Sequence, residues 1–235
     1  MNEDTLLVML VPSRGRPQNV VDLIDACTDI TTTNTQLAVI VDDDDPMLPG
    51  YQGLLRHQEF AELVVAPKQE IPTPGKIGQI LNVIALNYTG CHPYVGFLGD
   101  DHRPRTKGWD WRLIEMLDRP GVAYANDLFQ RANLPTSCVI SSELIQALGY
   151  MCPPTCEHLF LDDFWKLLGN TAGNLAYLPD VVVEHCHPAA GKAAWDAGYE
   201  YSMGRATMDG DRQRYTEFLN GPWLRDKQRV EALRV

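Results

Sequence analysis

The sequence of 235 residues lacks any run of the roughly 18 to 20 apolar residues that a membrane-spanning helix needs. Its first residues, Met1-Asn2-Glu3-Asp4, also lack the basic start of a secretory signal. These two absences argue against membrane association and export. A cytoplasmic location is therefore the simplest expectation.

Positive charge is scarce in this chain. It has 20 Lys and Arg residues against 31 Asp and Glu residues, which gives a formal net charge of −11 and a pI of about 4.9. An acidic surface disfavours loose, charge-driven binding to nucleic acid or to anionic membranes. A basic groove, if the protein has one, must be local.

The sequence also lacks a disulfide framework, internal repeats and a low-complexity linker. Its six cysteines do not follow framework-like spacing, so most of them are expected to be reduced and buried. Cys152, Cys156 and His158 do not have the spacing of a standard zinc site. With 45% hydrophobic residues the chain can bury one substantial core. A single domain over residues 1–235 is predicted, with a C-terminal helical tail from about residue 210.

Short apolar runs alternate with helical patterns along the chain. An unbroken apolar run such as residues 6–11 is typical of a strand that is buried on both faces. Apolar residues recur at helical spacing over residues 17–27 and 77–84. Further strands are expected at residues 37–41, 63–66, 94–98, 122–124, 138–140 and 181–183. This order predicts an α/β fold with a mostly parallel central sheet flanked by helices.

Polar clusters follow three of these strands. Residues 13–16 (Ser-Arg-Gly-Arg) come after the first strand, the four aspartates at 42–45 after the second, and residues 100–102 (Asp-Asp-His) after the fourth. In such a sheet, ligands bind beyond the carboxyl ends of the strands. The three clusters are therefore expected to face one crevice.

The acidic pair Asp100-Asp101 is the clearest chemical signal. Adjacent carboxylates repel each other and are tolerated when a cation binds between them. Oxygen ligands suit a hard divalent ion, and Mg²⁺ and Mn²⁺ often bridge protein carboxylates to phosphates. The alternative is a solvated acidic turn that caps the helix expected over residues 109–117.

The aspartates at 42–45 allow two interpretations. They could form a turn, which Asp45-Pro46 would start. Alternatively, a carboxylate such as Asp42 or Asp44 accepts hydrogen bonds from a base N–H or from ribose hydroxyls, or binds a metal. Four adjacent like charges cost stability, which favours a functional role.

Three cations are candidates for binding donor phosphates. Arg14 and Arg16 lie in the turn after the first strand. Lys76 precedes the helix at 77–84, whose N-terminal amides also attract anions. The alternative for each of the three is a solvent-facing charge.

A second cluster comprises His185, His187, Gly191 and Lys192. A neutral imidazole can bind a metal, a glycine lets the backbone approach a ligand closely, and a lysine can meet a pyrophosphate as a point charge. The alternative for either histidine is a core side chain that is hydrogen-bonded to the backbone.

Asp162 and Asp163 begin a helix that is predicted over residues 161–168. Capping and the helix dipole account for acidic residues at such a position. A carboxylate there can equally serve as the general base for an acceptor hydroxyl. Both interpretations stay open at this point.

Together these segments resemble the GT-A superfamily of nucleotide-sugar glycosyltransferases over about residues 5–195. Residues 11–17 resemble the first strand and turn of that superfamily, and residues 42–45 resemble its nucleoside-binding acidic site. Residues 97–101 resemble its metal-binding Asp-x-Asp segment, with Gly99 in the place of the first Asp. The chain is also similar to small bacteriophage-encoded glycosyltransferases, for which the location would be the host cytoplasm.

The resemblance implies a single-domain GT-A (Rossmann-like) fold and metal-dependent transfer of a sugar from a nucleotide diphosphate, with a UDP-sugar as the expected donor. It implies Mn²⁺ or Mg²⁺ bound by Asp101 and His187, with His185 as a competitor. Asp163 would be the catalytic base, with Asp162 beside it. The residues expected to bind the donor nucleotide and its diphosphate are Pro12, Ser13, Arg14, Arg16, Asp42, Asp44, Lys76, Asp100 and Lys192.

The acceptor is left open, and a hydroxymethylated base in phage DNA and a glycan are the two candidates. The basic residues Arg103, Arg105 and Lys107, beside the metal motif, favour DNA, whereas the net charge of −11 disfavours it. Two other functions stay in view. One is a nucleotidyltransferase, although the turn after the first strand has a single glycine; the other is a non-catalytic nucleotide-sugar-binding protein.

Overall fold

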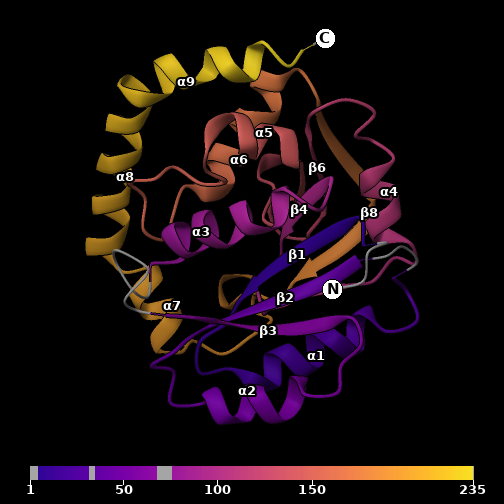
Figure 1. Cartoon of the computed structure of the whole chain (residues 1–235). Coiled ribbons are helices and arrows are strands. Elements are labelled where there is room, and N and C mark those ends of the chain that lie inside the picture. Colours follow the sequence, from indigo (N-terminus) through magenta and orange to yellow (C-terminus); the bar gives the residue numbers. More distant parts are fainter. Residues whose placement is uncertain (1–4, 32–34, 68–75, 235) are drawn as a thin grey trace.

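Eight strands form one sheet in the order β3-β2-β1-β4-β7-β6-β8-β5. The computed structural model of the protein describes residues 5–31, 35–67 and 76–234 (Figure 1). Four of the seven strand pairings are parallel, and the antiparallel ones are β4 with β7, β6 with β7, and β5 with β8. The strands are β1 (Leu7–Pro12), β2 (Thr35–Asp42), β3 (Ala61–Ala66), β4 (Tyr94–Phe97), β5 (His102–Pro104), β6 (Val122–Asn126), β7 (Cys138–Ser141) and β8 (Leu175–His185).

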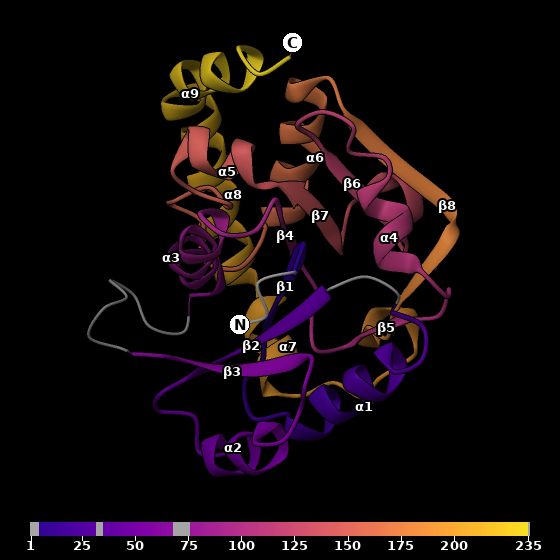
Figure 2. The same cartoon turned by 45° about the vertical axis from the view of Figure 1, so that its right-hand side comes forward.

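Helices cover both faces of this sheet. In Figure 2, α3, α5, α6, α8 and α9 lie on one side of the strands, and α1, α2 and α4 lie on the other. The helices are α1 (Pro17–Cys27), α2 (Leu48–Leu55), α3 (Ile77–Thr89), α4 (Trp109–Ile114), α5 (Ser142–Leu148), α6 (Leu161–Ala172), α7 (Ala197–Ser202), α8 (Arg205–Asn220) and α9 (Pro222–Glu231). The expected α/β fold, with a mostly parallel sheet between helices, is confirmed.

Strand β1 shows why its sequence is apolar at every position. Val8 and Leu10 belong to the core under α3, α5 and α6, whereas Leu7, Met9 and Val11 belong to the core under α1, α2 and α4. Successive side chains point to opposite faces of a strand. Because both faces of β1 are covered, no position tolerates a polar residue until the strand ends at the functional site.

The structure also extends elements beyond the bounds that the sequence patterns predicted. Helix α8 begins at Arg205, whereas the helical tail was expected from about residue 210, and it buries only Asp211 and Phe218, so no apolar stripe marks its start. Strand β8 begins at Leu175, whereas only residues 181–183 were expected, because its earlier positions are mostly half-buried. Strand β5 follows the acidic pair directly and has three residues.

Among the described residues, no helix is long and apolar enough to cross a membrane. All six cysteines are free, and four of them are buried, as predicted. The buried ones are Cys27, Cys138, Cys152 and Cys156.

Asp211 on α8 is expected to be a major source of stability. Its fully buried carboxylate accepts hydrogen bonds from the backbone N–H groups of Glu157, His158 and Leu159, at 2.8 to 2.9 Å. Asp211→Ala leaves these three donors without their acceptor. We expect the free energy of unfolding, measured in urea, to fall by about 3 kcal/mol.

The control is Asp209→Ala, an exposed position on the same helix, which should change stability by less than about 0.5 kcal/mol. Burial opposes ionisation of Asp211, but the three N–H groups lower its pKa. A lowered pKa means that the stabilisation is present above about pH 4 and is lost as the pH falls further. Equal stability of Asp211→Ala and the wild type would contradict this assignment.

Candidate functional site

The turns after β1 and β2 meet through charged side chains. The guanidinium of Arg14 donates hydrogen bonds to Asp42 at 2.7 Å and to Asp44 at 2.8 Å. Asp45 accepts a hydrogen bond from the backbone N–H of Gly15 at 2.7 Å. The aspartate run therefore has two uses: two carboxylates neutralise Arg14, and one holds the turn backbone.

Asp100 faces the same turn from the end of β4. The hydroxyl of Ser13 donates to its Oδ2 at 2.6 Å, and Arg16 and Asn19 donate to its Oδ1 at 3.4 and 3.3 Å. Burial, with the neighbouring Asp101 as a second cause, raises the pKa of Asp100. The structure thus brings the polar clusters after β1, β2 and β4 together.

One group of side chains in the described part of the chain has the geometry of a metal site. Potential ligand atoms of Asp101, His102 and His185 all lie within 4.8 Å of one another. His102 Nδ1 is 3.3 Å from Asp101 Oδ1, and His185 Nε2 is 3.2 Å from Asp101 Oδ2. The two histidines are opposite each other in the β5–β8 pairing, and their rings stack at 4.2 Å. The pairing of β5 with β8 therefore brings His102 and His185 together, although they are 83 positions apart in the sequence.

The hydrogen bonding of this group fits a divalent cation. The N–H of Gly99 donates to His102 Nδ1 at 3.0 Å, so that nitrogen carries a lone pair. Its contact with Asp101 therefore brings two acceptors together, which a cation between them would relieve. Burial, with His185 as a second cause, lowers the pKa of His102, so its ring is neutral at pH 7. The mixed oxygen and nitrogen donors favour Mn²⁺ over Mg²⁺, which prefers oxygen ligands.

Two buried nitrogens of the same histidines have no hydrogen-bond partner. They are His102 Nε2 and His185 Nδ1. The nearest carboxylate to the latter belongs to Asp127, whose Oδ2 lies 4.0 Å away. Buried polar atoms without partners are uncommon and mark sites where a ligand or a rearrangement completes the bonding.

His187 lies beside this group and outside it. Its Nδ1 accepts the N–H of Ala189 at 3.1 Å, and its ring stacks on Phe129 at 5.9 Å. His185 is the histidine in contact with Asp101. Sequence reasoning ranked His187 first as the metal ligand, and that role stays a prediction. His102 was not considered as a ligand, although it directly follows the acidic pair.

Segment α7 covers the acidic pair from the other side. The hydroxyl of Tyr199 donates to Asp101 Oδ2 at 2.7 Å, and the guanidinium of Arg16 lies 4.2 Å above the Tyr199 ring. Asp196 binds Arg16 through two hydrogen bonds of 2.6 and 2.8 Å. Tyr199 and Asp196 were missed because no motif surrounds them in the sequence.

Asp162 and Asp163 lie in the first turn of α6. They line a cavity together with Asp100 and Asp101. Burial, with the neighbouring Asp163 as a second cause, raises the pKa of Asp162 to about 6. Burial also raises the pKa of Asp163. The pair is therefore suited to accept a proton near neutral pH.

Three predicted donor-binding residues do not line the cavity: Asp44, Lys76 and Lys192. Lys76 forms an ion pair with Glu157 and donates to the hydroxyl of Tyr201 at 2.8 Å. Lys192 pairs with Glu184 at 2.8 Å. Both lie outside the lining of the cavity. Their contact with a diphosphate stays a prediction and would require these ion pairs to exchange.

A cavity of about 580 Å³ joins these parts of the site. Its size is within the usual range for ligand pockets, roughly 300 to 1,000 Å³. It lies beyond the carboxyl ends of β1, β2 and β4, where ligands bind in open α/β sheets. The predicted site residues that line it are Pro12, Ser13, Arg14, Arg16, Asp42, Asp100, Asp101, Asp162, Asp163, His185 and His187.

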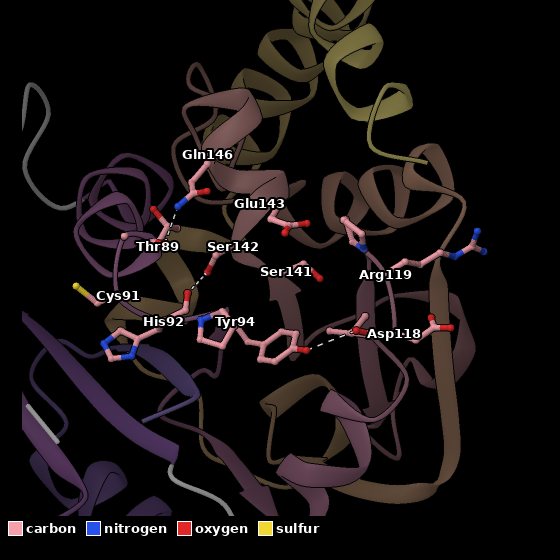
Figure 3. A pocket seen from close by; sticks show the side chains of 14 residues that line it. Thr89, Cys91, His92, Tyr94, Asp118, Arg119, Ser141, Ser142, Glu143 and Gln146 are labelled. Carbon is pink, nitrogen blue, oxygen red and sulfur yellow. Dashed lines mark hydrogen bonds between the residues drawn. The ribbon is translucent and has the colours of Figure 1, made fainter. Parts of the chain in front are cut away.

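A second cavity, of about 450 Å³, lies where β4 begins (Figure 3). Its polar side chains bind the backbone around it. Ser142 donates to the carbonyl of His92 at 2.5 Å, and Gln146 donates to that of Thr89 at 2.6 Å. These groups join α3, β4 and α5, so we assign them to the fold.

No protein-family model and no curated protein sequence matches this chain. Solved structures do. The mannosyltransferase PcManGT from Pyrobaculum calidifontis, in complex with GDP-Man and Mn²⁺, is similar with a TM-score of 0.58 and 13% identity, over 97% of this chain and 73% of that one. The glucosyl-3-phosphoglycerate synthase from Mycobacterium tuberculosis, in complex with Mn²⁺, UDP and phosphoglyceric acid, is similar with a TM-score of 0.56 and 14% identity, over 89% and 78% of the two chains.

S. aureus TarS is similar with a TM-score of 0.56 and 14% identity, over 76% of this chain. The chain spans 36% of that TarS structure and 59% of a shorter one. At such low identities, TM-scores above 0.5 show a shared fold and no more. The chain therefore has the GT-A fold of these structures, and its candidate metal group, acidic turns and cavity lie together in that fold.

Proposed function

We propose that the protein is a metal-dependent glycosyltransferase that transfers a sugar from a nucleotide diphosphate to a hydroxyl group. The observation that carries the proposal is the metal-site geometry of Asp101, His102 and His185 in a cavity shared with Asp163. The fold similarity to enzymes solved with Mn²⁺ and with UDP or GDP-mannose supports it. A UDP-sugar is the donor that we expect.

Each part of the site has a role in this reaction. Asp42, held by Arg14, would accept hydrogen bonds from the base or ribose. The metal, when bound by Asp101 and His185, supplies positive charge to the diphosphate. Arg16, now bound to Asp196, lines the cavity and is a cation that could turn to the phosphates.

The transfer step needs a base for the acceptor. Asp163 would accept the proton of the acceptor hydroxyl, whose oxygen forms a bond to the anomeric carbon. The bond from that carbon to the diphosphate oxygen breaks, and the nucleoside diphosphate leaves with the electron pair. Direct attack from the side of Asp163 would invert the anomeric configuration.

The pH dependence should reveal this base. The carboxylates of Asp162 and Asp163 act as a pair, and burial raises the pKa of both, that of Asp162 to about 6. A base works only when deprotonated, so kcat/KM should fall as the pH drops through the raised pKa of the base, and the fall should approach about tenfold per pH unit. If kcat/KM stays constant as the pH is lowered through about 4, the ordinary pKa of an aspartate, neither carboxylate accepts the proton.

A hydroxymethylated base in phage DNA is the acceptor that the sequence resemblance suggested. The basic cluster that favoured it is largely used within the fold. Arg103 is buried and donates to the carbonyls of Asp100 and His102, and Arg105 pairs with Glu184. DNA therefore stays an alternative, which the acceptor experiment below separates from a glycan.

Thermal unfolding with a panel of nucleotide diphosphates and nucleotide sugars, with and without Mn²⁺, tests the donor site. A ligand that binds only the folded state raises the midpoint by mass action. We expect one nucleotide to raise it, and only with Mn²⁺ present. No shift with any nucleotide would refute the proposed function.

A further inference from the structure

Part of the lining of this cavity has no role in the proposed donor site. This acceptor wall consists of Phe129, Gln130, Leu134, Thr136 and Phe160, which come from the segment after β6 and from the residue before α6. Its aromatic rings lie next to the reacting groups. Phe129 stacks on His187 at 5.9 Å and meets the His185 ring edge-on at 6.3 Å, and Phe160 precedes the acidic pair of α6 by two residues.

Some of the large side chains that line this cavity are exposed in the described part of the chain. The exposed fractions are 37% for Phe129, 51% for Tyr201 and 42% for Met203, and all three line the cavity. Large apolar groups that gather at one opening mark a surface for a ligand with its own apolar face.

The lining of the cavity offers little positive charge to an anionic ligand on the acceptor wall. Within the described residues, the cationic side chains that line the cavity are Arg14 and Arg16, each already paired with carboxylates in the turn region. Lys166, which follows Trp165 on α6, donates to the carbonyls of Ala132 and Asn133. A phosphate on this wall would therefore meet no cation from the lining.

One further titratable group of the lining adds no positive charge. Burial lowers the pKa of His158, so its ring is neutral at pH 7. Asp162 and Asp163 line the same cavity as the acceptor wall. Their charge repels phosphate groups.

We infer that the acceptor is a neutral sugar at the end of a glycan, bound with its apolar C–H face against Phe129 and Phe160. Gln130 and Thr136 offer hydrogen bonds to its hydroxyl groups. This specificity deepens the proposed function and rests on it, because the bound hydroxyl must face Asp163. A DNA acceptor would need phosphate-binding cations, which the wall does not provide.

Binding of matched neutral and phosphorylated sugars tests this inference. The probes are para-nitrophenyl glycosides of glucose, galactose, mannose and N-acetylglucosamine, each alone and as its 6-phosphate, together with a short DNA duplex that contains hydroxymethylcytosine. Affinities are measured by calorimetry and saturation-transfer NMR with UDP and Mn²⁺ present. At least one neutral glycoside should bind about tenfold more tightly than its phosphate.

Variants assign the binding to the acceptor wall. Phe129→Ala should weaken binding of the neutral glycoside about tenfold and leave the Mn²⁺-dependent rise in unfolding temperature with UDP unchanged. Leu134→Lys should instead strengthen binding of the phosphorylated glycoside. The matched control is Trp111→Ala, an aromatic residue of similar exposure (43%) on α4, outside the cavity, which should change neither affinity.

Three outcomes would overturn the inference: no neutral glycoside binds, the phosphate or the DNA binds at least as tightly, or Phe129→Ala has the effect of the control. Each of them is distinguishable from failure of the proposed function. The UDP and Mn²⁺ shift, measured in the same samples, reports on the donor site by itself.

Discussion

Asp101→Ala is expected to abolish metal-dependent binding of the donor. Asp101 supplies the carboxylate of the candidate metal group, with His102 at 3.3 Å and His185 at 3.2 Å. Two neutral imidazoles without an anionic ligand bind Mn²⁺ poorly. The rise in unfolding temperature with nucleotide and Mn²⁺ should vanish. Transfer should slow by about a thousandfold, since Lewis-acid stabilisation is worth several kcal/mol.

The variant should fold. In the wild type, the carboxylate of Asp101 lies beside that of Asp100, so its removal also relieves repulsion between like charges. Circular dichroism checks this point. The matched control is Asp180→Ala, a 70% exposed carboxylate on β8 that pairs with Arg112 outside the cavity. It should leave nucleotide binding unchanged. A Mn²⁺-dependent shift that survives in Asp101→Ala would show that the metal site lies elsewhere.

Asp163→Asn should separate catalysis from binding. The amide has nearly the same shape as the carboxylate but cannot accept the acceptor proton, and a positioned base typically contributes a factor of about 10² to 10⁴. We expect kcat to fall within that range while the UDP and Mn²⁺ shift keeps its wild-type size. The measurement is transfer of a labelled sugar to the neutral glycoside that binds most tightly, together with thermal unfolding.

The control for Asp163→Asn is its neighbour, Asp162→Asn. Asp162 also accepts the backbone N–H of Asp163 at 3.0 Å, so this variant should shift the pH profile more than it lowers the maximal rate. Full activity in Asp163→Asn would remove Asp163 as the base. If both variants keep nucleotide binding and the wild type transfers no sugar, the chain is a nucleotide-sugar-binding protein.

The sequence predicted that the polar clusters after β1, β2 and β4 would meet, because each cluster lies at the end of a strand. An apolar run buried on both faces must stop where the sheet meets solvent, so Ser13, Asp42 and Asp100 could be placed at one edge from the pattern alone. The pattern does not show which of these side chains bind each other. Which aspartate binds Arg14, and that Asp45 holds the backbone of the turn, depends on side-chain geometry.

The candidate metal group was predicted only in part. Asp101 was expected as a ligand from its acidic neighbour, and His185 only as a competitor of His187. His102 was not, because its role depends on the pairing of β5 with β8, which places it opposite His185. No local pattern encodes an antiparallel contact between a three-residue strand and one that ends 81 residues later, as counted from 104 to 185.

By itself, the sequence determined the alternation of strands and helices, the edge of the sheet at which polar groups gather, and the acidic character of the site. These are local properties, because burial on one or both faces of an element is written in its own residues. Only the tertiary structure decided which histidine reaches Asp101, that Tyr199 covers it, and that Lys76 and Lys192 pair with glutamates. These contacts join segments far apart in the chain, so they follow from how the sheet and helices pack.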